Sequence, residues 1–129
     1  MNQGLEKIKS FTDLNAWKEG HQLVISIYEI TKQFPNDELF GLTNQLRRAV
    51  VSFTSNIAEG FSRHSYKEKL RFYFIALGSL TEIQNQLLVA KDIKYLAIKN
   101  FNDLEEQTVK ISKITNGLIK KTKLIIHNS

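Results

Sequence analysis

Apolar residues recur every three or four positions through most of this 129-residue chain, and no other feature constrains its fold as strongly. This period gathers apolar side chains on one side of a helix, whereas a strand needs them at every second position. Proline, which interrupts helices most strongly, occurs once, at Pro35, and we find no strand pattern. The sequence therefore predicts an all-α protein.

The first two helices are delimited by capping and proline signals. The first is expected to begin with Asp13 as its N-cap and to end at Phe34, because Pro35 disfavours a helical conformation in the residue before it. The second is expected to begin within residues 36–41. Its core-facing side is predicted to hold Leu42, Leu46, Ala49, Val50, Phe53, Ile57 and Phe61.

The third helix is expected to begin at Tyr66, because Ser65 followed three residues later by Glu68 matches a capping box. Residues 92–100 then form a connection, and apolar spacing defines a fourth helix from Phe101 to about Leu124. Four helices with short connections predict an antiparallel up-and-down four-helix bundle.

We expect one domain over residues 1–129, with tails at 1–12 and 125–129. The chain has no apolar run of the ~18 residues that a membrane span requires, so no membrane partner is expected. Its start lacks the apolar segment of a secretory signal, which favours a cytoplasmic location. The absence of cysteine excludes disulfides, thiolate nucleophiles and cysteine-type metal sites.

The predicted third helix is apolar around much of its circumference. Its apolar residues are Leu70, Phe72, Phe74, Ile75, Leu77, Leu80, Ile83, Leu87 and Leu88. One core-facing stripe does not account for all of them, and a second apolar side left in water would exceed what monomers usually expose. The sequence therefore predicts a homo-oligomer.

The stretch "AVVSFTSNIAEGF", residues 49–61, has a polar side opposite its core-facing side. This polar side holds Gln45, Arg48, Ser52, Ser55, Asn56, Glu59 and Arg63. Small residues of the third helix, Ala76, Gly78 and Ser79, are expected to let the two helices approach closely, with Asn56 or Glu59 bonding across the contact. We therefore interpret the stretch as a packing or subunit contact.

A catalytic alternative for this stretch lacks the groups it needs. No histidine lies at helical spacing to activate Ser52 or Ser55, and His64 is five residues past Glu59. No Glu-x-x-His pair of the kind found in di-iron bundles occurs, and no phosphate-binding or dinucleotide-binding glycine motif is present. The sequence thus predicts no enzyme, no cofactor and no metal.

Three pieces of the chain, "LxxQLRRAxxS", "SNIAEGF" and "ALGSLTEIQNQLLVAK", occur in an order and spacing that resemble the four-helix bundle proteins encoded in 23S rRNA intervening sequences. The resemblance covers residues 11–91. It implies a ring-like homopentamer without established enzymatic activity. A related bundle is the accessory protein of diversity-generating retroelements, in which a basic pentamer binds nucleic acid and reverse transcriptase.

Residue by residue, the resemblance extends to Gln45, Arg47, Arg48, Ser52, Ser55, Asn56, Glu59, Gly60, Gly78, Ser79 and Glu82. One position departs from the family, because Thr54 stands where proline is common. A proline there would kink the second helix, so Thr54 is expected to leave it straighter and with its hydrogen bonds complete.

The net charge of +5 favours anionic partners, and a pentamer would carry about +25, enough for salt-sensitive phosphate binding. The predicted nucleic-acid-binding residues are Arg47, Arg48, Arg63, Lys67, Lys69, Arg71, Lys120 and Lys121. The predicted packing or subunit contacts are Ser52, Ser55, Asn56, Glu59, Phe74, Gly78, Ser79 and Glu82. The alternative hypothesis is an adaptor oligomer that binds a protein partner, such as a reverse transcriptase, and no nucleic acid.

Overall fold

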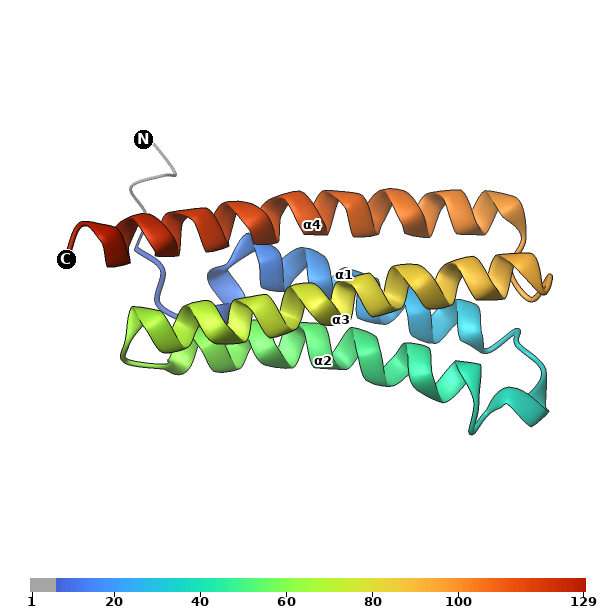
Figure 1. Cartoon of the computed structure of the whole chain (residues 1–129). Helices are drawn as coiled ribbons and strands as arrows, with labels where there is room; N and C mark the ends of the chain where they lie inside the picture. Colours follow the sequence, from blue (N-terminus) through green and yellow to red (C-terminus); the bar gives the residue numbers. More distant parts are fainter. Residues whose placement is uncertain (1–6) are drawn as a thin grey trace.

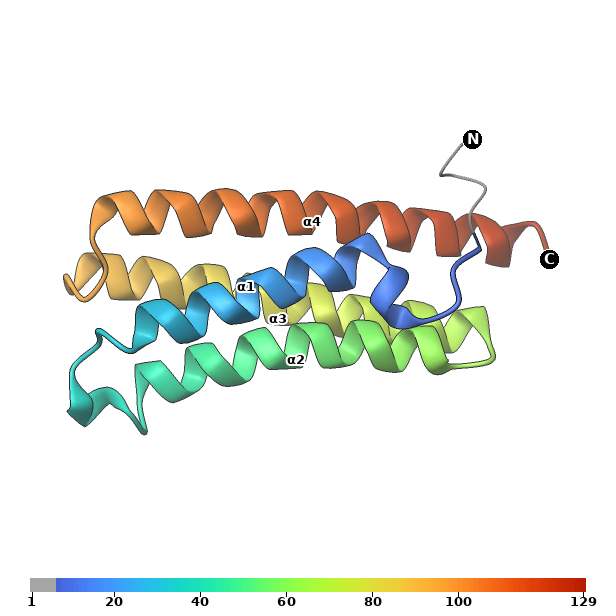
Figure 2. The same ribbon diagram turned by 180° about the vertical axis from the view of Figure 1, so that it is seen from behind.

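A computed structural model of the chain describes residues 7–129, and within them it contains four α-helices. The helices are α1 (Asn15–Thr31), α2 (Leu42–Ser62), α3 (Tyr66–Asp92) and α4 (Ile98–His127). Consecutive helices run in opposite directions along one long axis (Figure 1). Helix α3 packs against α2 and α4, and α1 packs against the same two helices from the other side (Figure 2). The predicted all-α four-helix bundle is thereby confirmed.

The core follows the predicted apolar spacing of α2. Leu46, Val50, Phe53 and Ile57 are completely buried, and Ala49 is nearly so. They meet apolar residues of the other three helices in one continuous cluster. Every buried position of this stripe recurs at three or four residues, as expected for a helix with one side turned to the core.

Helix α4 buries three threonines at intervals of seven residues. Thr108, Thr115 and Thr122 are at most 4% exposed, and each hydroxyl donates to a carbonyl of its own helix. These bonds satisfy polar groups that would otherwise be costly to bury. The threonines therefore belong to the core in the same way as the apolar residues beside them.

The start of α1 differs from the prediction. Asp13 is not the N-cap of this helix, because its carboxylate accepts hydrogen bonds from the backbone N–H groups of Lys9 and Ser10. Asp13 closes the short 3-10 helix η2 (Phe11–Asp13), which Ser10 caps, and Leu14 precedes α1 without a side-chain cap. The N–H groups of Lys9 and Ser10 hold the pKa of Asp13 below its ordinary value.

The connection between α1 and α2 also differs. Helix α1 ends at Thr31 rather than Phe34, and residues 36–38 form a separate 3-10 helix, η3 (Asn36–Glu38). The carboxylate of Glu38 accepts a hydrogen bond from the N–H of Leu42 at 3.1 Å, which satisfies a free donor at the start of α2.

The remaining boundaries agree more closely. Helix α3 begins at Tyr66 as predicted, with the Ser65 hydroxyl accepting a hydrogen bond from the N–H of Glu68. Helix α4 begins three residues before the predicted Phe101 and continues to His127, past Leu124. Helix α2 is unbroken through Thr54, as expected for a chain without proline there.

Candidate functional site

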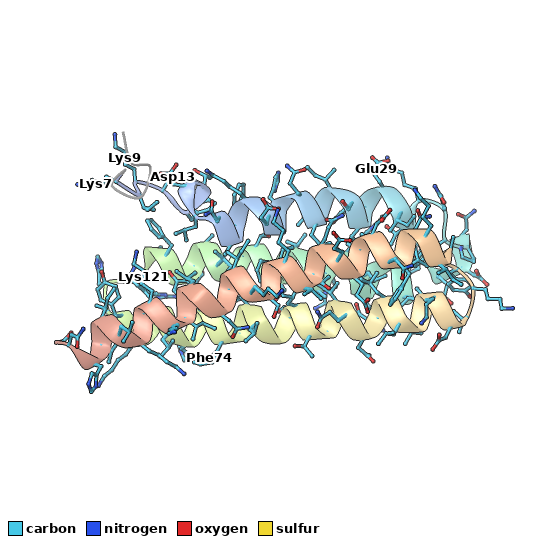
Figure 3. The ribbon with its side chains drawn as sticks, turned by 90° about the horizontal axis from the view of Figure 1, so that it is seen from above. Lys7, Lys9, Asp13, Glu29, Phe74 and Lys121 are labelled. Atoms are coloured by element: carbon cyan, nitrogen blue, oxygen red, sulfur yellow. The ribbon has the colours of Figure 1, made fainter. Side chains whose placement is uncertain are left out.

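One end of the bundle collects three segments that are far apart in the sequence. The turn between α2 and α3, the carboxyl end of α4 and the amino-terminal segment all lie there (Figures 1 and 2). Lys7, Lys9 and Lys121 lie at this end, whereas Glu29 lies at the opposite end (Figure 3). The up-and-down topology thus brings separate basic clusters of the sequence together.

We call this region the basic end and define it as residues 7–18, 58–72 and 113–129. These segments hold 11 of the 18 Lys and Arg residues but only 3 of the 13 Asp and Glu residues. The difference, 11 minus 3, is a formal charge of +8, whereas the other described residues, with 7 basic and 9 acidic residues, carry −2; Glu6, outside the described residues, accounts for the remaining −1. The net charge of +5 is therefore unevenly distributed along the bundle.

The basic side chains at this end differ in whether they are exposed or engaged in contacts within the chain. Lys67, Arg71, Lys120 and Lys121 are exposed. Their charges are available to a partner. Lys69 is different, because its ammonium group donates to the backbone carbonyl of Phe61 at 2.6 Å and burial lowers its pKa.

Arg63 is also partly engaged within the chain. Its guanidinium lies 3.1 Å from the Glu59 carboxylate and stacks over the Phe72 ring at 4.7 Å. Its Nε is buried and has no hydrogen-bond partner among residues 7–129. Lys69 and Arg63 therefore hold the α2–α3 turn together, and the exposed residues around them are the better candidates for contacting a partner.

Arg47 and Arg48 do not belong to the basic end. Arg47 lies 16 residues before Arg63, which is about 24 Å along a helix, and Arg48 lies 15 residues before it. The guanidinium of Arg47 stacks over the ring of Tyr28 at 4.7 Å, and its Nε donates to the hydroxyl of Thr31 at 2.9 Å. The predicted set of nucleic-acid-binding residues is thus split between two places.

The polar side of α2 contacts α3 through a pair of serines. The sequence predicted both as contact residues but did not predict a hydrogen bond between them. The hydroxyls of Ser52 and Ser79 are 3.0 Å apart, and Ser79 is buried. Asn56 donates to the carbonyl of Ser52 in its own helix, and Glu59 pairs with Arg63, the residue that follows the same helix. The expected bond from Asn56 or Glu59 across to α3 is therefore not formed.

The prediction that Gly78 permits a close approach to α2 is wrong. Gly78 lies on the exposed side of α3, and a Cβ there would meet no atom within 4 Å. Gly60 of α2 serves this purpose instead, because a Cβ on it would lie 2.7 Å from the Tyr73 ring. Periodicity alone did not distinguish the two glycines, since both stand within helical patterns.

The outward side of α3 exposes apolar residues in two separate pairs. Phe74 and Ile75 are 45% and 46% exposed, and Leu88 and Val89 are 42% and 41% exposed. The exposed residues between the pairs are Gly78, Thr81, Glu82 and Asn85. The surplus apolar surface expected for the third helix is present, but it is interrupted rather than continuous.

The remaining predicted contact residues lie on or beside this surface. Ser55 is exposed on α2. Glu82 is exposed on α3, where its carboxylate accepts a hydrogen bond from the side chain of Gln86 at 3.0 Å. The carbonyl oxygen of the same Gln86 side chain is buried without a partner. This surface is therefore polar along α2 and mixed along α3.

Metal-binding groups and membrane-spanning helices are two further features with a bearing on function. Among residues 7–129, no group of three or more His, Asp or Glu side chains is arranged to hold a metal ion. None of the helices in this part of the chain is long and apolar enough to span a membrane.

Comparison with known proteins gives a family and a fold. Residues 12–117 match the sequence profile of a family described as 23S rRNA-intervening sequence protein. No protein of the curated collection matches the chain significantly. The fold is similar to a crystal structure of a protein of unknown function from the S23 ribosomal protein family of Bacteroides thetaiotaomicron, with a TM-score of 0.76 and 20% sequence identity. The match covers 81% of this chain and 95% of that one.

Proposed function

This chain belongs to the 23S rRNA-intervening sequence protein family, and we propose that it is a non-enzymatic homo-oligomer that binds RNA or DNA electrostatically through its basic end. The charge of +8 on one end of the bundle, against −2 on the other described residues, carries this proposal. Phosphate backbones attract such a surface without any base-specific contact, and the attraction weakens steeply with salt.

The oligomer is proposed to be a pentameric ring, as the family resemblance implies. The two exposed apolar pairs of α3 supply surface for a subunit contact. In a cyclic ring, all copies of one region lie at the same level of the symmetry axis. Five basic ends then form one belt with a formal charge of about +40, which strengthens phosphate binding beyond that of a single subunit.

The absence of catalysis is part of the proposal, and the serine geometry supports it. Ser52, the more enclosed of the two candidate nucleophiles, shares its hydrogen bond with Ser79 rather than with a base. Asn56 also donates to the Ser52 hydroxyl at 3.2 Å. These contacts suit a structural serine. A cytoplasmic location and the absence of a cofactor are further parts of the proposal.

Titration of labelled RNA and DNA at two salt concentrations tests nucleic-acid binding. The expected result is binding at low salt whose affinity falls steeply as salt rises, and the absence of binding at low salt would overturn this part of the proposal. Light scattering after size exclusion tests the oligomer separately. A monomer of 14.9 kDa at micromolar concentration would overturn the ring.

The second candidate function is an adaptor oligomer that binds a protein partner, such as a reverse transcriptase, and no nucleic acid. Exposed apolar residues in and beside the two connections at the end opposite the basic end favour it. Phe40 is 90% exposed and Ile98 is 70% exposed, and Leu39 and Ile93 are each about half exposed. A chain that oligomerises but ignores both nucleic acids at low salt would favour this candidate.

A further inference from the structure

An open recess lies on the exposed side of α2, beside α1, and its volume is about 530 Å³. Its walls include Tyr28 of α1 and the side chains of Asn44, Arg47, Arg48 and Ser55 of α2. None of the residues that line it is acidic. Within the recess, Arg47 lies about 24 Å along the helix from Arg63 at the basic end, and Ser55, the lining residue nearest to Arg63, lies about 12 Å from it.

The guanidinium of Arg47 is fixed in place on one edge of this recess. Its Nε donates to the Thr31 hydroxyl at 2.9 Å, and that hydroxyl donates in turn to the carbonyl of Ile27 at 2.6 Å. The ring of Tyr28 supports the guanidinium plane at 4.7 Å. An arginine held by two neighbours, one of them itself fixed by a hydrogen bond, loses little further conformational freedom when it binds a ligand.

The charges of both arginines are unpaired within the described chain. Neither Arg47 nor Arg48 lies within ion-pair distance of a carboxylate of residues 7–129, whereas Arg63 does. The one side-chain hydrogen bond of Arg47 in this part of the chain uses Nε, which leaves its two terminal amino groups free. An oriented fork of two N–H donors matches two oxygens of a phosphate group.

We infer that this recess binds a phosphate group, either inorganic phosphate or the phosphate of a nucleotide. Arg47 supplies the oriented fork, and Arg48 supplies a second positive charge. Asn44 and Ser55, both exposed at the recess, supply neutral donors. Two arginines and no carboxylate favour a dianion such as phosphate over a singly charged carboxylate.

This inference goes beyond the proposed function, because the recess is separate from the basic end. Binding of a small phosphate ligand requires neither a nucleic-acid chain nor the combined basic ends of an oligomeric ring. If the recess fails the test below, the salt-dependent binding of nucleic acid at the basic end is unaffected, and the reverse also holds.

The test follows the Nε–Hε resonances of the arginines in the ¹⁵N-labelled protein while inorganic phosphate and then adenosine 5′-monophosphate are added at constant ionic strength. A saturating shift at Arg47 and Arg48, absent from Arg71, is expected with at least one of the two ligands. The ligand that saturates identifies the source of the phosphate. Adenosine, which lacks a phosphate, is the control ligand. Saturation by adenosine, equal linear shifts at all three arginines, or no shift with either phosphate ligand would overturn the inference.

A pair of variants checks that the charge acts locally. Arg48→Gln is expected to weaken the saturating ligand about tenfold, as loss of one charge-assisted hydrogen bond does. Arg71→Gln removes the same charge at the basic end and is expected to leave the affinity unchanged. Because both side chains are exposed, neither change should disturb the fold, and equal weakening by the two variants would contradict a defined site.

Discussion

Gly60 of α2 lies so close to Tyr73 of α3 that a Cβ on the glycine would come within 2.7 Å of the tyrosine ring. The same Cβ would also lie 3.0 Å from Cβ of Phe72. Tyr73 is only 2% exposed, so its ring is enclosed by the bundle and has little room to move. This contact sets the spacing of α2 and α3 beside the turn that joins them.

Gly60→Ala is expected to lower the free energy of unfolding by about 1–3 kcal/mol, because overpacking against Tyr73 outweighs the gain in helix propensity. Gly117→Ala in α4 is the matched control, since a Cβ there meets no atom within 4 Å. The control is expected to gain about 0.5–1 kcal/mol from propensity alone. Urea unfolding at one protein concentration measures both, and an equal gain in the two variants would contradict the close contact.

The stability of the protein is expected to fall between pH 10 and 12 in a way that depends on Tyr73. Burial raises the pKa of Tyr73 to about 12, so the unfolded chain loses this proton at lower pH than the folded one. The stabilisation is complete below pH 10 and disappears as the pH rises through the folded pKa.

Tyr73→Phe is therefore expected to lose less stability than the natural chain over this range, by between about 1 and 3 kcal/mol. Phenylalanine keeps the aromatic ring that is buried at this position, so the variant should unfold similarly at neutral pH. Tyr28→Phe, at an exposed tyrosine, keeps Tyr73 and should show the same alkaline loss as the natural chain. Urea unfolding at several pH values measures the free energy of unfolding of each protein. An equal loss of this free energy with pH in all three proteins would refute the assignment of the alkaline loss to Tyr73.

Replacing Lys67, Lys120 and Lys121 by Gln is expected to reduce the salt dependence of nucleic-acid binding. Each lost phosphate contact removes about 0.7 from the slope of log affinity against log salt for single-stranded RNA, so the triple variant loses about 2. The control replaces Lys32, Lys94 and Lys99, which are exposed away from the basic end, with the same change in charge. If both triple variants bind equally, total charge rather than the basic end governs binding.

Ile75→Glu combined with Val89→Glu is expected to convert the oligomer into a 14.9 kDa monomer. These residues belong to the two apolar pairs of α3, and burying new carboxylates in a subunit contact costs several kcal/mol. Ile98→Glu places a carboxylate on an apolar residue outside that surface and should leave the assembly intact. Light scattering measures the mass, and an unchanged oligomer would show that subunits meet through another surface.

The fold could be predicted from the sequence because it depends on local patterns. The recurrence of Leu46, Val50, Phe53 and Ile57 marks the buried side of α2, and the Ser65 cap fixes the start of α3. The start of α1 could not be predicted in the same way. Asp13 has the right chemistry for an N-cap, but its carboxylate bonds backward to Lys9 and Ser10, a competition that spacing does not reveal.

The candidate site was harder to predict, because it depends on distances between helices. The sequence displayed the basic clusters, but only the topology shows that Lys121 lies at the same end as the α2–α3 turn and that Arg47 does not. In the same way, Gly60 and Gly78 both fit a close helix contact by spacing. Only the position of Tyr73 shows which of them is used.

The uneven charge along the bundle gives each subunit a permanent electric dipole parallel to its helices. A polyanion that approaches from any side therefore exerts a torque that turns the basic end toward it. At physiological ionic strength this field extends only about 8 Å, so the reorientation occurs in the last step of the encounter. The geometry thus affects how fast productive collisions form as well as how tightly the partners hold.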